Sequence, residues 1–129
     1  MIGTFGPLIF STSSVLVLHP NNISRSISSR WAKHDTFRQK PKSEFKGADL
    51  QSLNFDIELS AVHGVRPRAM LELLEVMAES GLVYDLVIGG RPVGRHLWKI
   101  VSVSEAWGIL LNHGELYSAK VTVTLEEYV

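Results

Sequence analysis

The sequence contains no cysteine, so this chain can form neither disulfide bonds nor a metal site with thiolate ligands. No apolar run approaches the roughly 18 residues that a membrane-spanning helix requires. The first residues also lack the basic start and the long apolar stretch of a signal peptide. These absences suit synthesis in the cytosol, and we expect no membrane among the partners of this protein.

Motifs for catalysis and for cofactor binding are missing as well. The five histidines are far apart and show neither HxH nor HExxH spacing, and no serine lies in a GxSxG elbow. The GGRPVG stretch at Gly89–Gly94 matches neither phosphate-loop pattern. A tight hairpin turn explains it better, with Arg91 and Arg95 as a small pair that attracts anions. We expect no enzyme, no cofactor and no metal.

Charge is balanced overall but unevenly distributed. With 13 basic and 13 acidic residues, net charge favours neither nucleic acid nor a membrane surface as a partner. Between Arg25 and Lys46, however, seven basic residues face two acidic ones, a net charge of +5, and the remainder carries −5. The seven are Arg25, Arg30, Lys33, Arg38, Lys40, Lys42 and Lys46. A chain divided in this way can bind copies of itself or neighbours of opposite charge.

The stretch Leu50–Gly94 has the clearest pattern and predicts the centre of the core. Apolar and polar residues alternate over Leu53–Ser60, which is typical of a half-buried strand. Pro67 then begins a helix that Ser80 and Gly81 end. The apolar face of that helix is formed by Met70, Leu73, Leu74 and Met77. A second strand is expected over Leu82–Ile88.

The remaining patterns predict mostly strands. We expect an opening pair of strands over 1–18, extended chain over 23–36, a loop or projecting hairpin over 37–46, a strand over 93–103, a turn at 105–108 and a last strand over 117–125. The fold class is therefore α+β: an antiparallel sandwich or barrel with one flanking helix at about residues 67–80. We expect a single domain over 1–129, with an extended basic arm at about 24–46.

The basic arm has two interpretations. Its cations, together with Trp31, Phe37 and Phe45, could contact nucleic acid through charge and base stacking. Aromatic and arginine side chains are equally common as anchors at protein interfaces. Because the acidic remainder of the chain would repel DNA, we favour contact with protein and expect no specific nucleic acid.

The start of the helix contains a local conflict. Arg66 and Arg68 flank Pro67, where the helix dipole favours acidic residues, and each misplaced cation costs about 0.3–1 kcal/mol. Arginine is also a poor N-cap, although Glu72, four residues after Arg68, offsets part of the cost. Either the arginines are a tolerated surface defect, or an acidic patch of a neighbouring subunit receives them.

Several motifs, taken in order, resemble the tail protein U (GpU) family of contractile-tailed phages and phage-tail-like bacteriocins. They are MIGTFGPLIF, SRSISSRWAKH, GADLQSLNFDIELSAVHGVRP, LELLEVMAESG, LVIGGRPVGR and the ending VTVTLEEYV. The likeness spans essentially the whole chain. One departure is Arg66, where the family pattern leads us to expect an acid or an asparagine that caps the helix.

The resemblance implies a structural role in tail assembly and a fold related to that of tail-tube proteins. It implies a homo-oligomeric ring near the baseplate, between the tail tube and the central hub, with a hexamer favoured over a trimer. The partners would be the tube protein, the hub and other baseplate proteins. The protein would be made in the bacterial cytoplasm and incorporated into a phage tail or a tailocin. Ser24–Trp31 and Lys120–Leu125 are candidate edge strands for pairing between subunits.

The sequence is also compatible with two other functions. A tail terminator would also be structural but would lie at the head-proximal end of the tail. A nucleic-acid-binding module would use the basic arm, and its affinity would fall steeply with salt.

Overall fold

The computed structural model describes residues 3–12, 17–18, 20–61, 66–111, 114 and 116–129. In chain order its elements are β1 (Gly3–Phe5), β2 (Leu8–Thr12), β3 (Val17–Leu18), β4 (Pro20–Ser26), β5 (Ser29–His34), β6 (Lys42–Ala48), β7 (Ser52–Ser60), α1 (Pro67–Ser80), β8 (Val83–Tyr84), β9 (Leu86–Ile88), β10 (Arg91–Pro92), β11 (Leu97–Trp107) and β12 (Ser118–Tyr128). Three of the five histidines, His19, His63 and His113, lie outside the described residues.

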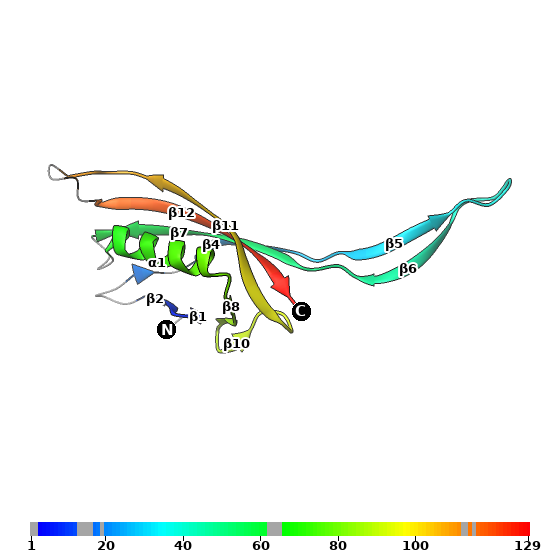
Figure 1. The fold of residues 1–129 in the computed structure, drawn as a ribbon, viewed down its shortest axis with the longest axis horizontal. Coiled ribbons are helices and arrows are strands. Elements are labelled where there is room, and N and C mark those ends of the chain that lie inside the picture. Colours follow the sequence, from blue (N-terminus) through cyan, green and yellow to red (C-terminus); the bar gives the residue numbers. More distant parts are fainter. Residues whose placement is uncertain (1–2, 13–16, 19, 62–65, 112–113, 115) are drawn as a thin grey trace.

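The strands form three antiparallel sheets. Sheet 1 has the order β10-β9-β1-β2-β3, sheet 2 has the order β4-β7-β12-β11-β8, and β5 pairs only with β6. The body consists of sheets 1 and 2 with α1, and the β5–β6 hairpin projects from one end of it (Figure 1). The predicted α+β class is therefore confirmed, as a sandwich of open sheets with one helix.

Sheet 2 is the foundation of the core. Within this sheet, β7 and β12 pair in a register that sets Phe55 opposite Val123 and Ile57 opposite Val121. All four side chains are fully or almost fully buried, because alternate residues of a strand point to the same face. Sheet 1 covers part of this inner face, where the rings of Phe10 and Phe55 meet edge to face at 5.8 Å. Helix α1 covers much of the rest.

Helix α1 begins and ends where the sequence predicts. Pro67 occupies the first turn, and Gly81 ends the helix in the left-handed conformation at φ 70°, which costs glycine no side-chain clash. The buried face consists of Pro67, Leu71, Leu74 and Met77, with Met70 and Leu73 partly buried beside them. Leu71, which is absent from the predicted face, therefore lies nearer the core than Met70 or Leu73.

The outer face of sheet 2 is polar. At its centre, the Asp56 carboxylate accepts hydrogen bonds from the Thr122 hydroxyl at 2.8 Å and from the Asn22 amide at 3.2 Å. These two bonds, and the charge of Lys120 at 3.9 Å, hold the pKa of Asp56 below its ordinary value. Asp56 thus joins three neighbouring strands on the side away from the core.

The expected strand over Leu82–Ile88 is divided in two. β8 pairs with β11 in sheet 2, whereas β9 pairs with β1 in sheet 1. The chain changes sheets at exposed Asp85, so this stretch links the two layers. Beyond it, Gly89 and Gly90 have φ values of 65° and 77° and set Ile88 opposite Arg91, as a two-residue hairpin requires. The GGRPVG stretch is therefore a turn.

Two other expectations in the second half of the chain are wrong. Glu105, Ala106 and Trp107 belong to β11, because ten residues of that strand pair with β12 and carry it past the expected turn. The Lys120–Leu125 stretch is not an edge strand, because β12 lies between β7 and β11. The other candidate edge is correct in part: Ser24–Ser26 lie on β4, at the edge of sheet 2.

We predict that two neighbouring positions of α1 respond very differently to truncation. Leu74→Ala removes a fully buried side chain from the contact with sheet 2 and should lower the free energy of unfolding by about 2–5 kcal/mol. Val76→Ala, at a side chain that is 63% exposed, should change it by less than about 0.5 kcal/mol. Urea unfolding of the two variants measures both values, and equal losses would contradict the packing described above.

Candidate interaction surfaces

The projecting hairpin carries its own small aromatic cluster. The ring of Trp31 meets the ring of Phe45 edge to face at 5.2 Å, and its indole N–H donates to the Ser29 hydroxyl at 2.7 Å. Across the same two strands, His34 Nε2 lies 2.7 Å from Glu44 Oε2. These contacts link the two strands of the arm and involve no residue of the body.

Large apolar side chains of the arm remain in solvent. Trp31 and Phe45 are 58% and 56% exposed, and Phe37, at the far end, is 86% exposed. The guanidinium carbon of Arg38 lies 5.1 Å from the centre of the Phe37 ring, with Arg38 in the left-handed conformation at φ 58°. The arm thus ends in an aromatic ring covered by a cation. Exposed rings and cations together are the chemistry of a protein-binding anchor.

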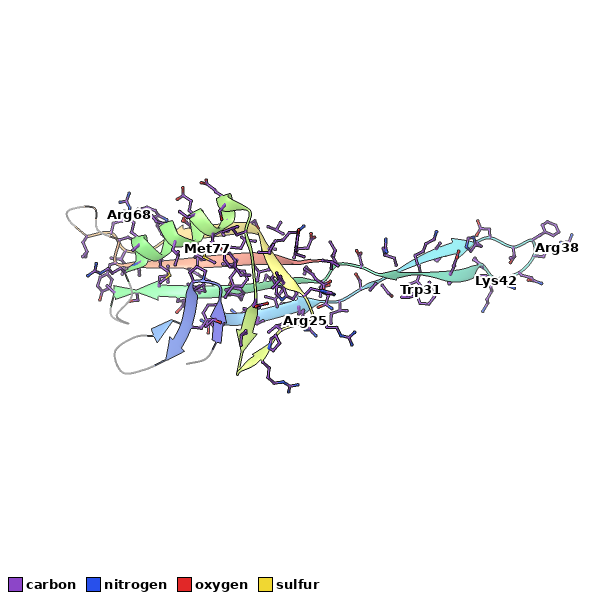
Figure 2. The ribbon with its side chains drawn as sticks, turned by 60° about the horizontal axis from the view of Figure 1, so that its bottom comes forward. Arg25, Trp31, Arg38, Lys42, Arg68 and Met77 are labelled. Carbon is purple, nitrogen blue, oxygen red and sulfur yellow. The ribbon has the colours of Figure 1, made fainter. Side chains whose placement is uncertain are left out.

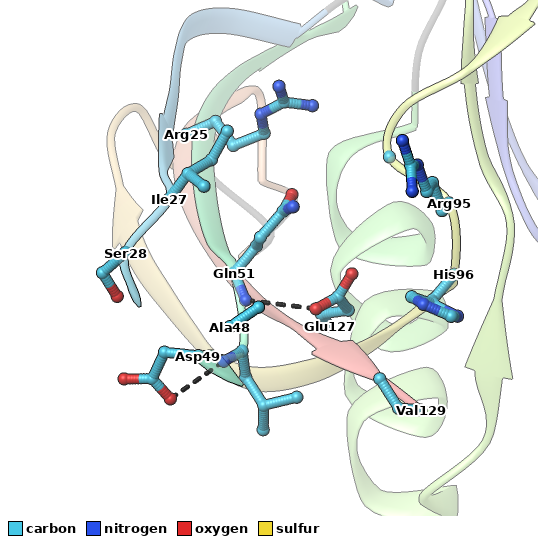
Figure 3. A pocket seen from close by; sticks show the side chains of 12 residues that line it. Arg25, Ile27, Ser28, Ala48, Asp49, Gln51, Arg95, His96, Glu127 and Val129 are labelled. Carbon is cyan, nitrogen blue, oxygen red and sulfur yellow. Dashed lines mark hydrogen bonds between the residues drawn. The ribbon is translucent and has the colours of Figure 1, made fainter. Parts of the chain in front are cut away.

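A pocket of about 470 Å³, here named the basal pocket, lies where the arm joins the body. Arg25 stands on one side of it, Arg95 and His96 stand on the other, and the Glu127 carboxylate lies between them (Figure 3). Glu127 is only 8% exposed and accepts a hydrogen bond from the backbone N–H of Gln51 at 3.4 Å. The wall therefore combines cations with one largely buried acid.

The polar side chains of this pocket can bind a ligand. The buried Gln51 Oε1 atom has no hydrogen-bond partner among the described residues, so the pocket can accept a donor. Arg25 and Arg95 can bind a carboxylate. Ser28 and His96 lie on opposite walls, so they do not form a nucleophile and base pair (Figure 3).

The helix start lies at the other end of the molecule. Arg66 is the N-cap of α1, with an extended backbone and no capping hydrogen bond from its side chain. Arg68 Nε lies 3.7 Å from Glu72 Oε1, as the i,i+4 spacing predicts, and the Arg68 guanidinium carbon lies 5.6 Å from the centre of the Trp107 ring. Contacts with other described residues thus partly resolve the conflict at Arg68 but not the one at Arg66.

The structure distributes the predicted interaction residues over separate surfaces. Arg38 and Lys42 lie at the far end of the arm, and Arg68 lies at the opposite end of the body (Figure 2). The residues on the arm are Arg30, Trp31, Lys33, Arg38, Lys40 and Lys42; Arg25 and Arg95 line the basal pocket; Arg91 lies on β10; Arg66 and Arg68 lie at the start of α1. Arg25 belongs to β4 of the body, so the hairpin itself starts later than residue 24.

Sequence reasoning missed a groove between α1 and β11, of about 240 Å³. Its lining consists of Leu71, Glu75, Ala78, Glu79, Val103 and Glu105. The acidic residues of α1 are visible in the sequence as a solvated helix face. Their closeness to Glu105 is a consequence of tertiary packing. Because the sequence predicts a turn at Glu105, it does not indicate a strand there that could pack beside the helix.

The part of the chain that the structure describes contains neither a cluster of metal ligands nor a membrane-spanning helix. No group of three potential metal ligands comes together there. None of the described helical segments is both long and apolar enough to cross a membrane.

We predict that the arm is stabilised locally by its aromatic pair. Phe45→Ala removes an edge-to-face contact worth about 0.5–1.5 kcal/mol, so amides over residues 29–48 should exchange roughly two- to tenfold faster. Exchange in β7 and β12 should not change, because the pair lies outside the body. Phe37→Ala, which removes a ring from the tip, is the matched control and should leave arm exchange near the wild-type rate. Acceleration throughout the body would contradict a separately stabilised arm.

Comparison with known proteins identifies the family of this chain. Among curated proteins, none matches the chain significantly. The family profile described as Phage P2 GpU matches residues 6–129, which is nearly the whole chain. The chain therefore belongs to the Phage P2 GpU family, whose members are structural proteins of phage tails.

Proposed function

We propose that this protein forms a ring at the baseplate-proximal end of the tail tube, between the tube and the central hub. Six copies in a ring is the arrangement that its resemblance to tube proteins favours, with three copies as the alternative. In this role the chain acts as one domain, whose basic arm and acidic body contact neighbouring proteins. Assembly, rather than catalysis, is its task.

The separation of charge between arm and body is the observation that supports this role most directly. The hairpin projects away from the body with its cations and aromatic rings exposed (Figure 2). Residues 29–48 contain six basic and two acidic residues, whereas α1 contains three glutamates and one arginine. Opposite charges on the arm and on the body of one molecule favour ordered contact between successive copies or with neighbours.

The edges of the sheets offer a second mode of contact. β4 lies at one edge of sheet 2, and both strands of the arm have a free edge in the described structure. Unpaired backbone groups at such edges form hydrogen bonds with strands of another chain. A ring built on strand edges and charge requires no cofactor.

The position in the tail is tested by imaging intact particles. We expect density for this chain in a closed ring between the tube and the hub. Density at the head-proximal end would identify a terminator instead. Binding of the purified protein to DNA at low salt, with an affinity that falls steeply as salt is raised, would favour the nucleic-acid alternative. Absence from the tail particle would refute the proposal.

Arg66 gives a test that separates assembly from stability. Arg66→Asp supplies a good N-cap and removes the misplaced cation, so the free energy of unfolding should rise by about 0.5–2 kcal/mol. If a neighbouring acidic patch receives Arg66, incorporation into tails should nevertheless fall. Arg66→Ala is the control, because it removes the same charge without adding a cap. Normal incorporation of both variants would make the arginine a surface defect only.

A further inference from the structure

The groove between α1 and β11 has an acidic rim and an apolar floor. Glu75 and Glu79 from the helix and Glu105 from the strand form the rim, and Leu71 and Val103 lie among them. No cation lines this groove, and none of the three carboxylates forms an ion pair with another described residue. Three like charges beside an apolar surface favour a ligand that brings both positive charge and apolar area.

One wall of the groove is a free strand edge. β8 pairs with β11 only at Trp98 and Lys99. From Val101 to Trp107, no described strand pairs with β11 on the side away from β12. The backbone groups of this edge are therefore available to another strand.

Helix α1 carries its charges in the order that its own dipole disfavours. Arg66 and Arg68 lie at its N-terminal end, and its first turn contains no acid. Glu79 lies next to its last residue, and its last turn contains no base. Helix dipoles favour the reverse arrangement at both ends. Among the described residues, neither the helix dipole nor an ion pair favours acidic residues at the C-terminal end of α1.

We propose that this groove receives the basic arm of a second copy of the same chain, with Phe37 and Arg38 at its tip and Lys40 and Lys42 behind them. This proposal rests on the ring of the proposed function and identifies the two surfaces that join its subunits. The cations of the arm meet Glu75, Glu79 and Glu105, and the tip ring covers the apolar floor. An arm strand lies beside the free edge of β11.

The occupant is a second copy because the arm points away from its own body. Figure 1 shows β5 and β6 extending beyond the end of sheet 2, whereas α1 lies along the body. Arm and groove are different surfaces, so each copy offers both to different neighbours. Such a head-to-tail contact closes into a ring when its rotation allows.

Cross-linking tests the contact directly, because the sequence has no cysteine of its own. Phe37→Cys combined with Ala78→Cys places one thiol at the arm tip and one in the groove. After treatment of assembled tails with a short bismaleimide, we expect a ladder of covalent oligomers. Phe37→Cys combined with Thr124→Cys, on the outer face of sheet 2, is the matched control and should give none. Assembled tails of the first variant that yield no ladder would overturn the proposal.

Charge reversal tests the same contact without any cross-link. Glu79→Lys places a cation at the C-terminal end of the helix, where the dipole favours it, so the unfolding midpoint should be unchanged or raised. Glu75→Lys with Glu79→Lys should weaken association between copies by about five- to tenfold. Reversal of Lys40 and Lys42 to Glu in the arm should weaken it similarly. Combining both reversals should restore most of the loss.

The outcomes separate this contact from the ring itself. If the variant with reversed groove charges associates and enters tails as well as the wild type does, the arm-in-groove contact is refuted. The proposed ring would still stand. Two reversals that fail to rescue each other also refute it. A wild-type chain that joins no tail particle refutes the proposed function, and the contact with it.

Discussion

The pairing of β7 with β12 is the constraint on which the rest of the molecule depends. Its register directs Phe55, Ile57, Val121 and Val123 to one face, and a slip of one residue would turn all of them to solvent. Helix α1 and sheet 1 stay in place because they cover this face. The same two strands present Asp56 and its hydrogen-bonding partners on the opposite face. One register therefore decides both the core and the polar outer surface.

The core leaves many side chains at both ends of the molecule exposed. The arm has no buried residue, and its Trp31 and Phe45 rings pack edge to face on each other. At the opposite end, Arg68 stacks over Trp107, and apolar residues 109–111 remain about half exposed. As a structural protein of phage tails, the chain is incorporated into the virion beside other tail components. Its exposed ends are the places where such components can meet it.

Local chemistry made some elements predictable from sequence. Pro67 and Gly81 mark the ends of α1 because each suits one helix end and no interior position. Alternation over β7 and β12 is equally direct, since both strands have one buried and one polar face. The division at Asp85 is not visible in this way. β8 and β9 are each too short to carry a pattern, and which sheet each joins depends on pairing with distant strands.

The candidate interaction surfaces were predictable only as composition. The cluster of cations at 25–46 is evident in the sequence, and the structure places most of it on one hairpin. The groove beside α1 is different, because Glu75 and Glu105 are brought together by packing of the helix on β11. The basal pocket likewise gathers Arg25, Arg95 and Glu127 from three distant segments. Residue type can be read from sequence, whereas neighbourhood requires the fold.

The way the arm is attached has a mechanical consequence. Its two strands continue from β4 and β7, which pair with each other in sheet 2, and the backbone N–H of Asp49 donates to the Ser28 carbonyl at its base at 3.1 Å. Tension along the arm would therefore run along these strands. Hydrogen bonds between antiparallel strands are perpendicular to the strand direction, so such a pull loads many of them together in shear. Force applied to the tip would be shared across the sheet, rather than opening it one bond at a time.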